Sequence, residues 1–261
     1  MLNNIANICM VTFNRLDFTK RSIQSIIDVT PKNTYTLSVV DNGSTDGTVE
    51  YLKELKKDGT LLNLLLLPNN IGSAKASNIL WQIVDDIYFV KCDNDIIINS
   101  ETWINDMITI TDNISEIGAV CHNVNRWSDL KLKKYGNIEV RITPWNQFTG
   151  GCTLIPKRTK NEIGYFCEDF GIYGEVDVDY AYRINKIDKI VVSMPDMNSA
   201  HHLQKREKEP EEYIKYKKDQ IKISSPIMHS NLREYDKDIK NIFKKPKVEL
   251  KDVQKYIWNE Q

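Results

Sequence analysis

The sequence has little of what marks secreted, membrane-spanning or nucleic-acid-binding proteins. It has five cysteines with no two close together, which favours reduced, mostly buried thiols over disulfides or a zinc site. No apolar run approaches the ~18 residues that cross a bilayer, and the N-terminus lacks the basic and apolar regions of a signal peptide. The formal net charge of -1 argues against nucleic acid as a partner. We therefore expect a soluble, cytoplasmic protein.

Glycine motifs that bind nucleotides are also missing. The first apolar run, IANICMVTF at residues 5–13, is followed by Asn14-Arg15, where a dinucleotide-binding fold would have G-x-G-x-x-G. The chain has no P-loop, and no glycine-rich, basic loop follows the first run. These absences disfavour Rossmann dehydrogenases, P-loop kinases and sugar-nucleotide nucleotidyltransferases.

What the sequence does have is a globular composition and a regular alternation of elements. Of its 261 residues, 41% are hydrophobic and 27% are charged. Within the first 95 residues, strand-like apolar runs alternate four times with stretches of helical period, beginning near residues 5, 35, 61 and 87. This order predicts an α/β fold with a mostly parallel central sheet and flanking helices.

The second half is less regular. We predict helices over 101–111 and 176–187, strands over 117–122, 152–155 and 189–194, and an aromatic, glycine-rich loop over 165–174. Residues 126–148 show no clear period. From residue 209 the chain is charged and mainly helical, and Pro246 is predicted to begin a loosely held terminal helix.

The C-terminal part is more basic than the rest. Residues 201–261 hold 15 Lys or Arg against 11 Asp or Glu, a local net charge of +4. Such a segment either makes peripheral contact with an anionic membrane, here at its inner face, or is a solvated helical face.

Polar residues follow the ends of the predicted strands. Asp93 and Asp95 come directly after the fourth apolar run, two positions apart, and the loop 41–47 after the second run holds two glycines and two aspartates. Open α/β sheets bind ligands at this edge, and paired carboxylates suit Mg²⁺ or Mn²⁺ shared with substrate phosphates. Either feature alone is also typical of an ordinary turn.

Taken together, five motifs in order resemble the inverting family-2 glycosyltransferases of GT-A fold, from about Ile5 to His202. The motifs are VTFNR at 11–15, VVDNGSTDGT at 39–48, NNIGSAKASN at 69–78, CDND at 92–95, and residues 149–183, which resemble a rhamnosyltransferase-like branch. The resemblance implies a glycosyltransferase domain over 1–204, with a nucleotide-binding half, 1–95, and an acceptor and catalytic half, 96–204. Residues 205–261 would form a helical extension.

The resemblance also implies a function. The expected reaction is a metal-dependent, inverting transfer of a sugar from a UDP- or dTDP-sugar to a hydroxyl acceptor, either a glycan or a lipid-linked sugar. Asp93, Asp95 and His201 would hold Mn²⁺ or Mg²⁺, with His202 as the alternative to His201. The residues expected to bind the nucleotide are Thr12, Asn14, Arg15, Asp41, Gly72, Lys75, Asp93 and Asn94.

The acceptor side departs from the family pattern. Where the family has E-D-x-D-L-x-x-R, this chain has Glu175-Val-Asp177-Val-Asp179-Tyr-Ala-Tyr-Arg183, which makes Asp177 the expected catalytic base and leaves Glu175 as the alternative. Trp127, Trp145 and Glu175 are the expected acceptor contacts, although the tryptophans could equally fill a small core. Two other functions stay open, a nucleotidyltransferase and a non-catalytic module that binds nucleotide sugars.

Overall fold

The structure is a computed structural model and describes residues 6–84, 87–124, 129–203 and 211–259. Its first half is the predicted alternation of strands and helices, because strands buried on both faces show in a sequence as unbroken apolar runs. The elements are β1 (Ala6–Thr12), α1 (Leu16–Val29), β2 (Tyr35–Asp41), α2 (Thr48–Lys57), β3 (Asn63–Leu66), α3 (Ser73–Ile83) and β4 (Tyr88–Cys92).

The second half contains the predicted elements and several that the sequence did not predict. In chain order they are β5 (Ile96–Ile98), α4 (Trp103–Asn113), β6 (Ile117–Cys121), β7 (Leu132–Tyr135), β8 (Ile138–Thr143), the short 3₁₀-helix η1 (Trp145–Gln147), β9 (Cys152–Pro156), α5 (Lys157–Ile163), α6 (Val176–Asn185), β10 (Ile190–Ser193), β11 (Ala200–His202), α7 (Glu211–Asp236), α8 (Leu250–Val253) and the 3₁₀-helix η3 (Gln254–Tyr256).

Within the described residues, nine strands form one sheet in the order β3-β2-β1-β4-β9-β6-β10-β8-β7. Strands β3, β2, β1 and β4 pair in parallel with one another in this order, and β6 pairs in parallel with β10. Strand β9 runs antiparallel between β4 and β6, and β8 runs antiparallel to β10 and β7. Seven of the nine strands therefore point in the same direction, with β9 and β8 reversed, so the sheet is mainly parallel, as predicted. Strands β5 and β11 form a separate antiparallel pair.

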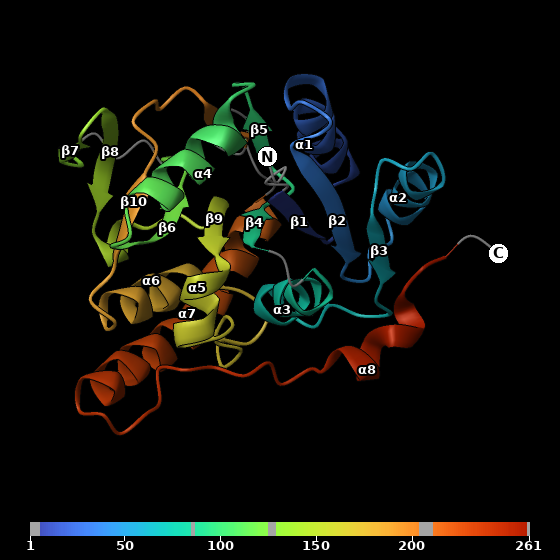
Figure 1. Ribbon diagram of the computed structural model, residues 1–261. Helices are drawn as coiled ribbons and strands as arrows, with labels where there is room; N and C mark the ends of the chain where they lie inside the picture. The colour runs from blue at the N-terminus through green and yellow to red at the C-terminus, as the bar shows by residue number, and fades with distance from the viewer. Residues whose placement is uncertain (1–5, 85–86, 125–128, 204–210, 260–261) are drawn as a thin grey trace.

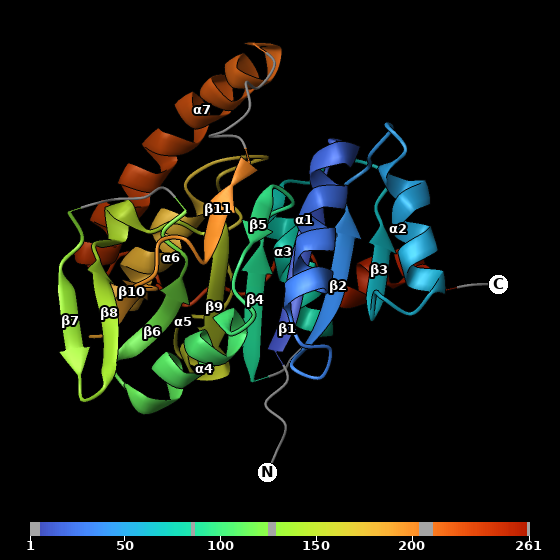
Figure 2. The same cartoon turned by 90° about the horizontal axis from the view of Figure 1, so that it is seen from above.

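Helices cover both faces of this sheet (Figures 1 and 2). On one face α1, α2 and α4 bury Ile23, Leu52 and Trp103 in an apolar core. On the other face α3, α5, α6, α7 and α8 build a second core, which includes Trp81 and Tyr180. The result is a three-layer α/β/α architecture, in which the parallel strands β1 to β4 carry their following loops to one edge of the sheet.

The hairpin β7–β8 lies in the stretch where no period was predicted. Strand β7 is an edge strand with exposed lysines, so it carries no apolar signal, and charged edges of this kind discourage pairing with other chains. Strand β8 does alternate, with Ile138, Val140 and Ile142 at every second position, and Gly136 in the two-residue loop has φ +59°. That alternation and the glycine turn are the signal that could have predicted the hairpin.

The C-terminal extension is held more closely than predicted. After α7 the chain runs along α3 to the outer strand β3, and Gln82 both donates to the carbonyl of Val248 at 2.9 Å and accepts from the N–H of Leu250 at 3.1 Å. The N–H of Trp258 donates to the carbonyl of Leu64 at 2.8 Å, and Val253 is buried. The prediction of a loosely held terminal helix is therefore wrong, because hydrogen bonds to the backbone of this segment leave no trace in its sequence.

Two predictions from composition can be compared with the structure. All five cysteines are free and buried, which confirms the expectation about thiols. In the part of the chain that the structure describes, no helix combines the length and apolar character needed to cross a membrane.

One buried histidine gives the fold a sensitivity to acid. His122, directly after β6, is 1% exposed, and its Nδ1 lies 2.8 Å from the hydroxyl of Ser199. Burial lowers the pKa of His122 to about 4, against a smaller opposing effect of the charge of Asp196. The folded protein therefore holds this imidazole neutral at a pH where the unfolded chain protonates it.

We predict that protonation of His122 in the unfolded chain lowers the free energy of unfolding by about 2 kcal/mol between pH 7 and pH 5. The stabilising contribution of the neutral imidazole is complete above the unfolded pKa of 6.5, and it is lost as the pH falls toward the folded pKa of about 4. Urea unfolding at pH 7, 6 and 5 measures this, and His122→Phe should flatten the slope by that amount. His229→Gln, at an exposed position on α7, is the matched control and should keep the wild-type slope. A wild-type slope in His122→Phe would contradict the prediction.

Candidate active site

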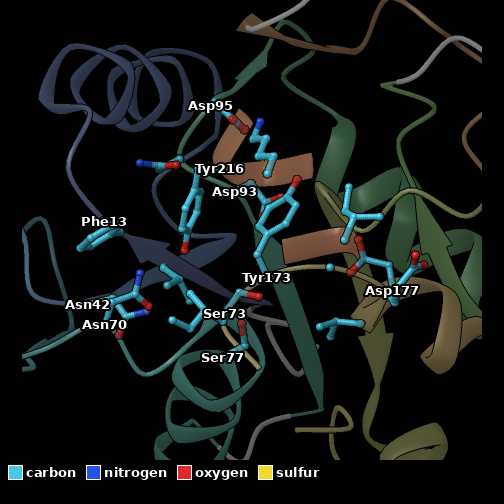
Figure 3. A pocket seen from close by; sticks show the side chains of 18 of the residues that line it. Phe13, Asn42, Asn70, Ser73, Ser77, Asp93, Asp95, Tyr173, Asp177 and Tyr216 are labelled. Carbon is cyan, nitrogen blue, oxygen red and sulfur yellow. The ribbon is translucent and has the colours of Figure 1, made fainter. Parts of the chain in front are cut away.

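The polar loops after β1, β2, β3 and β4 surround a pocket of about 530 Å³. Its other walls are the loop before α6, the first turn of α6, β11 and the first half of α7. Figure 3 labels ten of the side chains that line it, which are Phe13, Asn42, Asn70, Ser73, Ser77, Asp93, Asp95, Tyr173, Asp177 and Tyr216. The pocket lies where open, parallel sheets bind their ligands.

The turn after β1 is held in an uncommon backbone conformation. Asn14 and Arg15 have φ of 54° and 65°, in the left-handed region that non-glycine residues rarely adopt. Asn14 supports this turn, since its N–H donates to Ser44 Oγ at 2.7 Å and its Oδ1 accepts from the N–H of Thr45 at 2.8 Å. The turn places Arg15 in the pocket, where its guanidinium lies 3.0 Å from Asp95 and 4.2 Å from the ring centre of Phe18.

Asp41 is placed differently from the prediction. It is fully buried, and its oxygens accept hydrogen bonds from Thr12 Oγ1 at 2.8 Å, Ser44 Oγ at 2.5 Å and the N–H groups of Gly43 and Ser44. Thr12 and Asp41 therefore fold the loop after β2 instead of facing the pocket. Asn42, the next residue, lines the pocket and donates to Asn70 Oδ1 at 2.8 Å.

The first turns of α3 form part of the pocket wall, but the predicted Gly72 and Lys75 are not among the described lining residues. Ser73 and Ser77 line the pocket. Gly72 has φ +96°, and a Cβ there would lie 2.5 Å from the carbonyl oxygen of Gly171, so this glycine allows α3 to approach the loop before α6. Further along the same helix, Asn78 pairs with both backbone groups of Phe166, at 3.0 Å each. The motif at 69–78 and the loop before α6 thus meet, although they are far apart in sequence, because α3 contacts the backbone of that loop.

The acidic motif after β4 lines the pocket. Lys91 Nζ lies 2.5 Å from Asp93 Oδ1, and Arg15 pairs with Asp95, so each carboxylate has a basic partner. Asn94 also lines the pocket, and its side chain donates to Thr19 Oγ1 in α1 at 2.9 Å. The motif is therefore fixed from β4, from the β1 turn and from α1.

The electrostatic surroundings of Asp93 disfavour its charged form. Desolvation raises its pKa from 3.8 to about 6; Lys91 opposes this shift, and the negative charges of Asp95 and Asp177 add to it. Because the charge of Asp177 contributes to this raised pKa, we expect the two acidic parts of the pocket to interact electrostatically.

Of the two histidines in β11, the one that faces the acidic motif is His202. It lines the pocket, and its Nε2 lies 3.5 Å from Asp95 Oδ1. His201 lies on the opposite side of the strand, with Nδ1 3.0 Å from the side-chain amide of Asn99. This alternation follows from β11 pairing with β5, which the sequence did not predict.

The second acidic part of the pocket is at the start of α6. Glu175 precedes the helix with φ 55°, and both Glu175 and Asp177 line the pocket. The N–H of Gly150 donates to Asp177 Oδ2 at 3.2 Å, and a Cβ on Gly150 would lie 2.0 Å from Asp177 Oδ1. Only glycine at position 150 leaves room for the Asp177 carboxylate in this place.

Of the two predicted acceptor tryptophans, the structure describes only Trp145. Trp127 lies outside the described residues. Trp145, in η1, packs edge-on against Tyr182 of α6 with ring centres 5.2 Å apart, and it is absent from the described lining of the pocket. Its role is to fill the second core, the alternative that the sequence left open.

The sequence missed the aromatic and basic residues that α7 brings to the pocket. Tyr213, Tyr216 and Lys217 line it, and Lys217 Nζ lies 4.6 Å from the ring centre of Tyr213. Burial raises the pKa of Tyr173, from the loop before α6, and the charges of neighbouring Tyr213 and Asp93 act in the same direction. The pattern of α7 gave no hint of this, because its polar face and its pocket-lining face look alike in sequence.

Comparison with known proteins bears on this site. The family model described as glycosyl transferase family 2 matches residues 7–175. A search of curated proteins finds no match.

Solved structures resemble the fold at low sequence identity. A mannosyltransferase from Pyrobaculum calidifontis, in complex with GDP-Man and Mn²⁺, is 18% identical with a TM-score of 0.57, over 74% of this chain and 55% of that one. TarS from S. aureus, residues 1–349, is 15% identical with a TM-score of 0.58, over 76% and 60%. GalNAc-T7 with UDP, GalNAc and Mn²⁺ is 14% identical with a TM-score of 0.62, over 77% and 44%. The present chain thus spans about half the length of these proteins.

We predict that Asp93 titrates near pH 6 and that Asp177→Asn lowers this pKa, because removal of a nearby negative charge favours the ionised form. Carbon-13 NMR of labelled aspartate carboxyl groups measures the titration. Asp252→Asn, on α8 and exposed, is the control and should leave the pKa of Asp93 unchanged. An unchanged pKa in Asp177→Asn would show that the two acids do not interact.

Proposed function

Because the chain belongs to glycosyl transferase family 2, we propose that it transfers a sugar from a nucleotide sugar to a hydroxyl group of an acceptor, with inversion at the anomeric carbon. The observation that carries this proposal is one pocket with acidic groups from two separate parts of the chain. Asp93 and Asp95 follow β4, and Asp177 begins α6 (Figure 3). Transfer needs both a place for the leaving diphosphate and a base for the incoming hydroxyl.

The proposed cofactor is Mn²⁺ or Mg²⁺. Asp93, Asp95 and His202 offer carboxylate and imidazole ligands that suit such an ion, and Asp95 and His202 are 3.5 Å apart. Among the described residues, no three such side chains form a complete metal-binding group, so phosphate oxygens of the donor are proposed to supply further ligands. When bound, the ion would offset the negative charge on the leaving diphosphate.

The proposed reaction is a direct displacement. The acceptor oxygen forms a bond to the anomeric carbon while the bond from that carbon to the diphosphate oxygen breaks, and the proton of the acceptor hydroxyl moves to Asp177. General-base assistance of this kind contributes about 10²–10⁴-fold to the rate. Asp177 suits this role because Gly150 fixes its carboxylate at the pocket wall. Arg15 and Lys217 supply positive charge for the diphosphate.

The proposed donor is a UDP- or dTDP-sugar. Asn42 and Asn70 place amide groups at the ends of β2 and β3, where the nucleoside would lie, and Phe13 offers an aromatic face beside them (Figure 3). Structural neighbours contain UDP or GDP-Man, which supports a nucleoside diphosphate without choosing the base.

The proposed acceptor is a glycan or a lipid-linked sugar. We assign residues 1–95 to the donor half and residues 96–204 to the acceptor half, and α7 completes the pocket from outside both. The outer part of α7 extends beyond the sheet (Figure 2) and exposes Ile214, Ile221 and Ile223 among lysines. A peripheral contact with a membrane surface through this helix is part of the proposal.

We predict that Asp177→Asn lowers turnover by about 10²-fold or more while UDP binding persists, because the variant removes the base and keeps the shape. Nucleotide release from a panel of UDP-, dTDP- and GDP-sugars measures turnover, and calorimetry measures UDP binding. Glu175→Gln is the matched variant next to it and should retain turnover. The opposite result would make Glu175 the base, and release from no donor by the wild-type protein would favour a non-catalytic binding module.

We predict that Mn²⁺ tightens UDP binding and that His202→Ala reduces this gain at least about tenfold, as expected when a ligand or its support is removed. His201→Ala is the control from the same strand and should behave as the wild type, since His201 faces Asn99. Calorimetric titration of UDP with and without Mn²⁺ measures both. An equal loss of the Mn²⁺-dependent gain in UDP affinity in the two variants would contradict the assignment of His202 to the metal site.

A further inference from the structure

A lysine is buried between the two acidic parts of the pocket. Lys91 lies on β4, at the centre of the sheet, and is 8% exposed. Its Nζ donates to Asp93 Oδ1 at 2.5 Å and to the carbonyl oxygen of Gly150 at 2.8 Å. An apolar side chain would fill this position in the strand without the cost of desolvating a charge, so the ammonium contributes something other than packing.

Gly150 carries the contact onward to Asp177. Its carbonyl accepts from Lys91, and its N–H donates to Asp177 Oδ2. The carbonyl of the adjacent Gly151 accepts from the N–H of Asp93 at 2.7 Å. The glycine pair is thus bonded to Asp93 directly through Gly151, and indirectly through Gly150 and Lys91. A continuous set of hydrogen bonds therefore runs from Asp93 through Lys91 and Gly150 to Asp177.

We propose that Lys91 is a positioning residue for glycosyl transfer, which sets the place of Asp177 relative to Asp93 through the Gly150 peptide and holds a positive charge between the two carboxylates. This inference rests on the proposed function and adds a residue to it. Lys91 touches neither reacting atom; it acts through the acid that faces the leaving group and through the glycine that supports the base.

The physical reason is the need to hold like charges close together. Asp93, Asp95 and Asp177 line one pocket and repel one another when all three are ionised. A cation among them reduces this repulsion, and its hydrogen bonds fix where two of the carboxylates stand. Displacement reactions are sensitive to such placement, since an error of about 1 Å between reacting groups costs about 10²-fold in rate.

The test compares kcat and donor KM of Lys91→Met, Lys91→Arg and Lys160→Met with those of the wild type, using the nucleotide sugar that the wild type turns over fastest. Lys160 is the matched control, because it is also 8% exposed but lies on α5, where its Nζ contacts the carbonyl of Trp81 at 3.5 Å. UDP binding by calorimetry and thermal unfolding accompany the kinetics.

We expect Lys91→Met to lower kcat about 100-fold with donor KM and UDP affinity within about threefold of wild type. Lys91→Arg, which keeps the charge and the donors, should recover kcat to within about tenfold of wild type, and Lys160→Met should match wild type. A merely structural lysine would lower stability without this separation of kcat from KM and without rescue by arginine.

Two results overturn the inference alone: Lys91→Met with kcat within about threefold of an active wild type, or Lys91→Arg as slow as Lys91→Met. Should Lys91→Met fail to fold, Lys91→Gln takes its place, since it keeps a hydrogen-bond donor without the charge, with the same expected loss and the same contradicting result. A wild-type protein that turns over no donor would instead overturn the proposed function, and this inference with it.

Discussion

A buried ion pair between Asp179 and Arg183 holds together the part of the molecule that carries Asp177. Both side chains are fully buried, 2.7 Å apart, and one helical turn separates them on α6. Arg183 also donates to the carbonyls of Ile163, Tyr165 and Ile242, and the hydroxyl of Tyr235 donates to Asp179 at 3.0 Å. Loss of one partner from such a pair typically costs about 3–5 kcal/mol. The pair therefore fixes α6 against the loop before it, against α7 and against the C-terminal segment.

Much of the fold could be predicted because its signals are local. Each of the strands β1 to β4 is a mostly apolar run, and each is followed by polar turn residues, so chain order alone predicts where the loops meet. This places the acidic motif after β4 beside the turn after β1, and Arg15 does pair with Asp95. The prediction of Asp177 has a different basis, because it rests on the resemblance of residues 149–183 to the family motif and not on the order of the strands.

The direction in which each side chain points could not be predicted in the same way. Asp41 has the sequence context of a ligand-binding residue, yet four hydrogen bonds within its own loop and to Thr12 use its oxygens. His202 and not His201 faces the pocket, because of a strand pairing between residues about 100 positions apart. Such outcomes depend on long-range register, where a shift of one residue exchanges the two faces of a strand.

Most of the pocket wall lies within the residues that the family model matches, and α7 completes it from outside them. The family model ends at residue 175, whereas Tyr213, Tyr216 and Lys217 come from α7. A Cβ on Gly174 would lie 2.3 Å from Ser224 Oγ, so α7 presses against the loop just before Asp177, and Tyr235 further along α7 bonds to Asp179. Any movement of α7 would therefore act on both sides of Asp177. Helix α7 is therefore joined by direct contacts to the residues on either side of Asp177, the acid proposed as the base. The C-terminal extension thus forms part of the pocket wall.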